Sequence, residues 1–121
     1  MIGIGVDAVG IERFRRSLER TPSMRERIFT AAELAYVAPK SDPAPSLAAR
    51  FAAREATMKA LGLGLGAFGF HDVSVVVADS GAPSLVVVGQ AARLADAAGV
   101  TRWHLSLTHD HDLAIAYVVA E

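Results

Sequence analysis

The sequence contains no cysteine among its 121 residues. Disulfides and thiolate metal sites are therefore excluded, and nothing requires an oxidising compartment. It also lacks an apolar run of the roughly 18 residues that cross a bilayer, and its N-terminus has neither the basic region nor the cleavage site of a signal peptide. These absences predict a cytoplasmic protein without a membrane partner.

The sequence also lacks a surplus of charge, because its formal net charge is −1. Binding to nucleic acid requires a basic surplus that neutralises phosphates, so no nucleic-acid partner is expected. Apolar residues make up 52% and charged residues 21%, which is typical of a globular chain. The length predicts one domain, residues 1–121, whose small core would gain from oligomerisation.

The stretch from Ser46 to Gly64 places charged side chains in a helix that is otherwise small and apolar. At about 100° per residue, Glu55 and Lys59 lie one turn apart on one stripe. Ala48 and Ala52 share this stripe and would leave room beside the charges. The alternative is an ordinary pair on a wet surface, which contributes a few tenths of a kcal/mol.

The other faces of this predicted helix are mostly apolar. One side is predicted to face the core and consists of Leu47, Phe51, Met58 and Leu61. Another is a stripe of small residues that would let a second backbone approach closely, namely Ala49, Ala53, Ala56 and Ala60. Ser46 is the predicted N-cap, and Gly62 and Gly64 are expected to stop the helix. Arg54 falls among the large apolar residues, and the sequence suggests no partner for it.

The N-terminal run Met1–Val6 is apolar and contains two glycines, which favours a buried strand that another element approaches closely. Asp7 is expected to end this strand, either as a cap or as a carboxylate that holds a metal ion. The helical pattern of residues 9–20 follows. Its arginines Arg13, Arg16 and Arg20 share one face, which is either simply solvated or docks an acidic partner helix.

The middle of the chain contains mostly connecting and structural elements. Thr30 and Glu33 have capping-box spacing and open a short helix, which a proline-rich loop at residues 39–45 follows. Residues 62–69 are rich in glycine and form either a flexible connector or a loop whose N–H groups reach a phosphate. A hairpin is predicted around residues 80–82, and a helix over residues 90–98.

The C-terminal stretch predicts a strand that ends near His109 and a closing strand over residues 113–119. His104, Ser106 and Thr108 line the polar side of the first strand, which either is wet or binds a polar ligand. His109 stands at the end of this strand, where its imidazole can donate a hydrogen bond to a phosphate. His109 and His111 lack a third ligand for zinc, so no zinc site is assigned.

Three blocks of the sequence together resemble the holo-acyl-carrier-protein synthase family of 4′-phosphopantetheinyl transferases. They are GIGVDAVGIERF at 3–14, SLAARFAAREATMKALG at 46–62 and WHLSLTHDHDLAIA at 103–116, and FTAAEL at 29–34 extends the match. The resemblance implies an α+β fold with an antiparallel sheet and helices packed on one side. It also implies a homotrimer with sites at the subunit interfaces.

The resemblance implies that the chain transfers phosphopantetheine from coenzyme A to a serine of apo acyl carrier protein, with Mg²⁺ as the working ion. Asp7 and Glu55 would bind the metal, and Lys59 would neutralise the pyrophosphate. Roles near coenzyme A would be taken by Arg50, Gly62, Gly64, Ser106, Thr108 and His109, of which His109 is also counted as catalytic. The carrier protein would dock on the face that carries Arg13, which Arg16 and Arg20 share.

Several points stay open at this stage. The chain has Arg54 where the family commonly has lysine, and the role of Asp110 is not assigned. The sequence does not identify the general base or the subunit that supplies each site residue. It also does not indicate whether the carrier protein belongs to fatty acid or polyketide synthesis. The alternative function is a non-enzymatic trimer that binds coenzyme A or a carrier protein.

Overall fold

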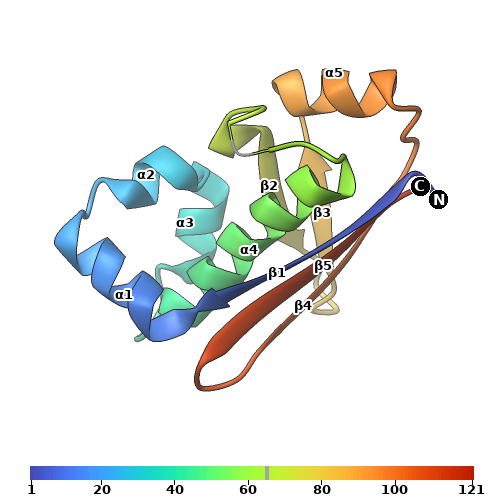
Figure 1. Ribbon diagram of the computed structural model, residues 1–121. Helices are drawn as coiled ribbons and strands as arrows, with labels where there is room; N and C mark the ends of the chain where they lie inside the picture. The colour runs from blue at the N-terminus through green and yellow to red at the C-terminus, as the bar shows by residue number, and fades with distance from the viewer. Residues whose placement is uncertain (65) are drawn as a thin grey trace.

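The computed structural model describes residues 1–64 and 66–121. A long helix lies across one face of a three-stranded antiparallel sheet (Figure 1). The elements in chain order are β1 (Gly3–Gly10), α1 (Ile11–Arg20), α2 (Met24–Ile28), α3 (Ala31–Val37), α4 (Ala44–Ala60), the 3₁₀ turn η1 (Phe70–Asp72), β2 (Val73–Val77), β3 (Pro83–Val87), α5 (Gly89–Ala97), β4 (Trp103–His109) and β5 (Leu113–Ala120).

The main sheet has the strand order β1-β5-β4, so the last strand of the chain lies between the first and the fourth. Gly3 pairs with Ala120, and Gly10 pairs with Leu113. Both chain ends therefore lie at the same edge of the molecule (Figure 1). The hairpin β2–β3 forms a separate two-stranded sheet. The α+β class is confirmed, with two antiparallel sheets instead of one.

The contact between α4 and β1 is unusually close, as the glycines and alanines of the two segments predicted. A methyl group built on Gly5 would lie 1.9 Å from the carbonyl oxygen of Ala56, and one on Gly3 would lie 1.8 Å from that of Ala60. Only residues without a Cβ allow two backbones to meet in this way. Side chains alternate along a strand, so Asp7 lies on the same face of β1 as these glycines.

Three sequence-based boundaries are wrong, each for a local reason. Asp7 does not end β1, because β5 continues to pair with this strand as far as Gly10. The helix α1 accordingly begins at Ile11, two residues later than the apolar pattern indicated. Ser46 is not the N-cap of α4, which begins at Ala44 after Pro43. Proline suits the first turn of a helix, since no intrahelical partner for its N–H is needed there.

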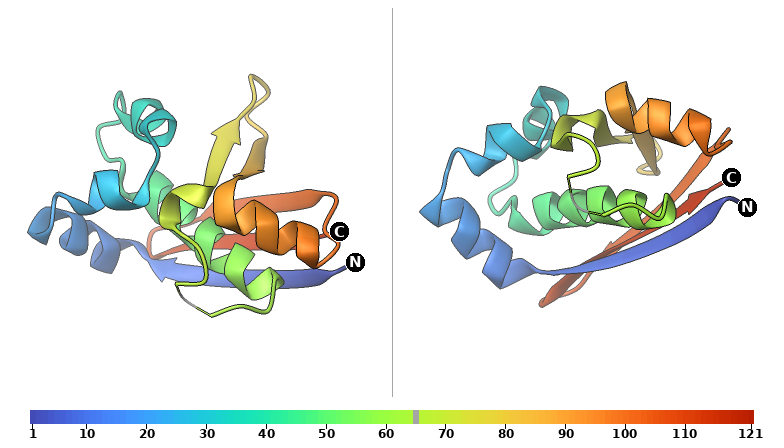
Figure 2. Two further views of the ribbon diagram at one scale, coloured as in Figure 1. Left: turned by 90° about the horizontal axis from the view of Figure 1, so that it is seen from above. Right: turned by 45° about the horizontal axis from the view of Figure 1, so that its top comes forward.

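The core lies between α4 and the sheet and extends under the three short helices. Ala48 and Ala52 are fully buried in it, so they do not leave open space beside Glu55 and Lys59 as predicted. The helices α1–α3 gather around one end of α4, and α5 lies toward the end where the termini meet (Figure 2). Among the described residues, no helix is long and apolar enough to span a bilayer.

The opposite face of the main sheet has no helix over it in the described part of the chain. Ile4, Val6 and Tyr117 on this face are 48%, 49% and 44% exposed. Val6 and Ser106 both pair with Tyr117, so these three residues form one row across the sheet. Exposed apolar side chains such as Ile4, Val6 and Tyr117 on one face of a small domain are typical of a surface that another protein covers.

Candidate active site

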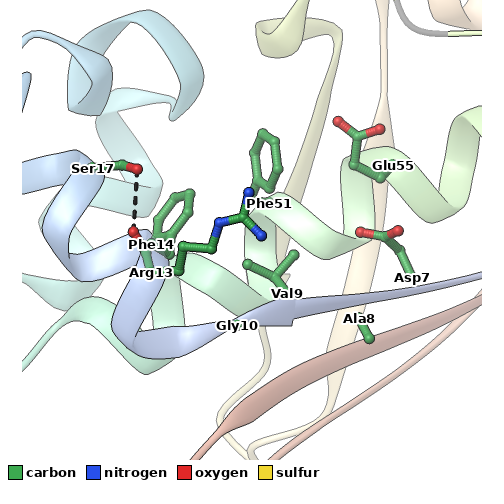
Figure 3. Close-up of a pocket in the computed structure, with 9 residues that line it drawn as sticks. All are labelled: Asp7, Ala8, Val9, Gly10, Arg13, Phe14, Ser17, Phe51 and Glu55. Atoms are coloured by element: carbon green, nitrogen blue, oxygen red, sulfur yellow. Dashed lines mark hydrogen bonds between the residues drawn. The ribbon is translucent and has the colours of Figure 1, made fainter.

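The sequence-predicted metal ligands meet in a cleft between β1, α1 and α4. Asp7 projects from β1 and Glu55 from α4, and their carboxylates lie side by side at one end of this cleft (Figure 3). The cleft has a volume of about 400 Å³, and Val9, Phe14 and Phe51 supply most of its apolar wall. The structure thus brings together two carboxylates that are far apart in the sequence.

Lys59 joins this pair from the next turn of α4. Its Nζ donates to Asp7 Oδ1 at 3.0 Å and to the carbonyl oxygen of Val6 at 3.1 Å. The lysine side chain is 55% exposed and that of Asp7 19% exposed. The ammonium group is therefore within reach of solvent and of any anionic ligand that enters beside Asp7.

Glu55 is the half-buried member of the group, and it makes no hydrogen bond with any described residue. Burial raises the pKa of Glu55 above its ordinary value, the negative charge of Asp7 raises it further, and Lys59 opposes the shift. Two carboxylates held close together in a partly desolvated cleft repel each other. A bound cation would remove this repulsion, so the arrangement suits a hard divalent ion.

The carboxylate cleft continues into a basic groove along α1, which Arg13, Arg16, Glu19 and Arg20 line. Arg13 lines both hollows and extends into the cleft in Figure 3. The three arginines make no ion pair with any described residue. Arg15, on another side of α1, is paired with Glu12 and Asp42. The shared face that the sequence predicted is therefore confirmed, and its charge is available to an acidic partner.

A second pocket, of about 280 Å³, collects Arg50, Thr108 and His109 from α4 and the end of β4. Tyr36 and Lys40 also line this pocket, although nothing in the sequence indicated either there, and so does Ser46, which was predicted only as a helix cap. The Arg50 guanidinium carbon lies 4.7 Å from the centre of the Tyr36 ring, and Nη1 donates to the Ser46 carbonyl oxygen at 3.2 Å. Tyr36 and Lys40 could not be linked to Arg50 from spacing, because they belong to α3 and the loop after it, whereas Arg50 lies on α4.

Arg50 is 4% exposed, and its Nε has no hydrogen-bond partner in the described structure. A buried N–H donor without a partner is costly, and an oxygen-rich ligand in the pocket would satisfy it. Lys40 and Arg50 also make the pocket positive. Its chemistry therefore suits a phosphate group.

The two pockets lie on different sides of α4 within one chain. Arg50 and Glu55 are five residues apart, which places them about 140° apart around the helix axis. Ser106 projects from the open face of the sheet and lines neither pocket. Gly62 has a φ of 71° and follows the end of α4, in a loop where nothing stands close to it or to Gly64. Leu65 of this loop lies outside the described residues.

Arg54, for which the sequence suggested no partner, is fully buried in an ion pair with Glu33. Its Nη1 donates to Glu33 Oε2 at 3.0 Å, and its Nε donates to the Phe70 carbonyl oxygen at 2.8 Å. Glu33 also accepts from the Val75 N–H at 3.0 Å while it completes the predicted capping box with Thr30. This network ties α3, α4 and β2 together behind the two pockets.

Asp110, the other unassigned residue, forms the turn between β4 and β5. Its Oδ1 accepts from the backbone N–H groups of Asp112 and Leu113 at 2.8 and 2.9 Å. These hydrogen bonds lower the pKa of Asp110. Its position in the structure therefore indicates a turn-forming residue beside His109.

Known proteins resemble this chain over nearly its whole length. A family profile described as "4′-phosphopantetheinyl transferase superfamily" matches residues 3–118. The holo-[acyl-carrier-protein] synthase of Clavibacter michiganensis subsp. michiganensis is 53% identical over 98% of this chain and 94% of its own. That of Frankia casuarinae is 46% identical over 100% of this chain and 98% of its own.

Solved structures agree in fold. The structure of holo-[acyl-carrier-protein] synthase from Neisseria meningitidis superposes with a TM-score of 0.90 at 32% identity, covering 100% of this chain and 98% of that one. The Helicobacter pylori synthase, solved in complex with coenzyme A, gives a TM-score of 0.85 at 29% identity and covers 98% of this chain and 99% of that one.

Proposed function

Since this chain belongs to the 4′-phosphopantetheinyl transferase superfamily, we propose that its carboxylate cleft and its basic pocket are the two parts of one transfer site. The chain is an enzyme that transfers phosphopantetheine from coenzyme A to acyl carrier protein. The observation that carries the proposal for the cleft is the meeting of Asp7, Glu55 and Lys59 at its end. We also propose that the reaction takes place in the cytoplasm.

The residues of the cleft fit a magnesium ion. Asp7 and Glu55 offer hard carboxylate oxygens, and Glu55 has no other partner among the described residues. No described group contains three or more side chains of the types that could hold a metal ion. Magnesium commonly keeps several waters and binds through one or two carboxylates plus substrate phosphates, so two protein ligands suffice. A bound magnesium ion would supply positive charge where the pyrophosphate is attacked.

In the proposed reaction, the carrier serine hydroxyl attacks the β-phosphate of coenzyme A, and adenosine 3′,5′-bisphosphate leaves. Lys59 is placed to neutralise the negative charge on the pyrophosphate, because its Nζ extends past Asp7 into solvent. Positioning and charge neutralisation carry most of the rate in such transfers. The serine proton is proposed to pass to Glu55, whose carboxylate lies in the same cleft as Asp7.

The carrier protein is proposed to dock along α1. Arg13, Arg16 and Arg20 present unpaired positive charge in a groove that leads to the carboxylates. An acidic helix laid in this groove would deliver a serine at its end to the cleft. Arg13, which lines both hollows, would contact the carrier nearest the reacting phosphate.

Coenzyme A is proposed to place its nucleotide end in the pocket of Arg50, Thr108 and His109. The unpartnered Nε of Arg50 and the ammonium of Lys40 give that pocket its affinity for phosphate. Ser106, Gly62 and Gly64 remain proposed contacts of the coenzyme, each outside this pocket in the single chain. His109 is proposed to donate to a coenzyme phosphate.

A homotrimer with shared sites is the assembly we propose. Its first support is the exposed row that includes Val6 and Tyr117 on the open face of the sheet. Its second support is the division of the site, since the carboxylate cleft and the Arg50 pocket lie on different sides of α4. In a ring of three copies, the cleft of one subunit can face the pocket of its neighbour.

The test is the mass of an apo acyl carrier protein after incubation with coenzyme A, Mg²⁺ and this protein. The wild type should add one phosphopantetheine, whereas Asp7→Asn and Glu55→Gln should leave the carrier unmodified. Asp96→Asn, an exposed change on α5, is the matched control. Near-normal modification by either cleft variant would remove the metal assignment. Binding of coenzyme A without any mass shift would favour the non-enzymatic binding module.

A further inference from the structure

The backbone contact between β1 and α4 occurs beside the proposed metal ligands. An ideal Cβ on Gly5 would lie 1.9 Å from the Ala56 carbonyl oxygen and 2.8 Å from the Ala60 nitrogen. Both are backbone atoms, so no side-chain rotation could relieve the clash. Ala56 follows Glu55 directly, and Asp7 lies two residues beyond Gly5 on the same face of the strand. The two carboxylates therefore stand on the backbone segments that touch at Gly5.

The size of the displacement that a side chain would cause follows from these distances. Ordinary van der Waals contact begins at 3.4 Å, whereas the Cβ would lie at 1.9 Å. Strand and helix would have to separate locally by about 1.5 Å to accept even alanine, roughly the length of one carbon–carbon bond. Errors of about 1 Å in the placement of reacting groups can lower a rate by about a hundredfold.

We propose that Gly5 is a positioning residue: its missing side chain sets the separation of Asp7 and Glu55 to one that suits a small octahedral cation. This inference rests on the proposed metal site. Magnesium requires nearly ideal octahedral geometry at about 2.0–2.1 Å, whereas calcium accepts about 2.3–2.6 Å and flexible coordination. A wider gap between the carboxylates therefore costs magnesium more than calcium.

The experiment measures divalent metal binding directly, without turnover. Bound and free Mn²⁺ are distinguished by electron paramagnetic resonance, and Mg²⁺ or Ca²⁺ is added as competitor to the full chain at 10 °C. Gly5→Ala should bind Mg²⁺ at least tenfold more weakly, with a smaller loss for Ca²⁺. Gly69→Ala, outside the cleft, is the matched control, because its Cβ would meet nothing closer than Asp72 Oδ1 at 3.9 Å. It should leave both affinities unchanged.

A second variant keeps the test decisive if Gly5→Ala folds poorly. Asp7→Glu adds one methylene of reach, so it should weaken Mg²⁺ binding in the wild-type background and partly restore it beside Gly5→Ala. Equal Mg²⁺ affinity in the wild type and in Gly5→Ala, or in the wild type and Asp7→Glu, would overturn the positioning role. Loss of stability in Gly5→Ala with an unchanged ratio of Mg²⁺ to Ca²⁺ affinity would also overturn it, because it indicates packing alone.

The metal site itself is tested separately with Asp7→Asn. If the wild type binds Mn²⁺ no better than Asp7→Asn, the proposed metal site fails and the role of Gly5 falls with it. If the wild type binds and Asp7→Asn does not, the comparison of Gly5→Ala with Gly69→Ala decides the positioning role alone.

Discussion

Removal of the Arg54 guanidinium should be among the most destabilising single changes in this chain. Glu33 is 1% exposed, and in Arg54→Met its carboxylate would keep, among the described residues, only the N–H and hydroxyl of Thr30 and the N–H of Val75 as donors. Loss of one partner from a buried ion pair typically costs about 3–5 kcal/mol, because an uncompensated charge is left behind. The Phe70 carbonyl oxygen would lose the Arg54 donor as well.

Chemical denaturation at pH 7 and constant protein concentration measures this loss. At about 4 °C per kcal/mol for a chain of this size, the thermal midpoint should fall by roughly 12–20 °C. Arg54→Lys keeps the positive charge. Its single ammonium group, however, cannot donate both to the two carboxylate oxygens of Glu33 and to the carbonyl oxygen of Phe70. Its loss should be smaller, about 1–3 kcal/mol, which is the range for one buried polar group left unpaired.

Arg93→Met provides the control, because Arg93 is exposed on α5 and its side chain bonds only to Gln90 among the described residues. Its free energy of unfolding should change by no more than about 0.5 kcal/mol. Constant protein concentration is essential, since association of subunits would itself add stability. If Arg54→Met lay within 1 kcal/mol of the wild type, the energetic importance of the buried pair would be refuted.

Two further substitutions test the coenzyme pocket and the arginine face of α1, and a pH series tests the charge of the buried Arg54–Glu33 pair. His109→Ala should mainly raise the KM for coenzyme A in a carrier-modification assay; a large fall in kcat at saturating coenzyme would instead give His109 a catalytic role. Arg16→Ala should raise the KM for the carrier several-fold at low salt and less at high salt, whereas Arg93→Ala should not, and equal effects would refute docking on α1. Burial would raise the pKa of Glu33, but the hydrogen bond and charge of Arg54 outweigh this and hold it below its ordinary value. The folded pKa thus lies below the unfolded value of about 4.3, so this stabilisation is complete above that pH and is lost as the pH falls through the folded pKa. The stability gap between wild type and Arg54→Met should therefore narrow from pH 7 to pH 3 in parallel urea titrations, and a constant gap would contradict the assignment.

The fold was predictable where short-range pattern determines structure. The Thr30–Glu33 capping box needs only two residues three apart, and it is present as expected. A close approach by another element was predicted separately for the glycines of β1 and for the alanines of α4, but not that these two segments approach each other. Asp7 was placed wrongly at a strand end, since the length of β1 is set by its pairing with β5 at the other end of the chain.

The candidate site was only partly predictable. The carboxylates and Lys59 were named from the family blocks, and the structure brings them together. The pairing of Arg54 with Glu33 was missed because the partners are 21 residues apart and Glu33 was already explained by its cap. Lys40 was missed for the same physical reason, since only the packing of α3 against α4 brings it near Arg50.

The position of β5 between β1 and β4 has a consequence for the way the protein is made. Among the described elements, the strand that carries Asp7 is synthesised before the others, whereas its partner in the main sheet, β5, is synthesised after them. Pairings between the two ends of a chain form slowly, because a long loop must close first. We therefore expect that the nascent chain cannot hold Asp7 against α4 until β5 is available. Within one subunit, the carboxylate cleft can thus be completed only after β5 has been synthesised.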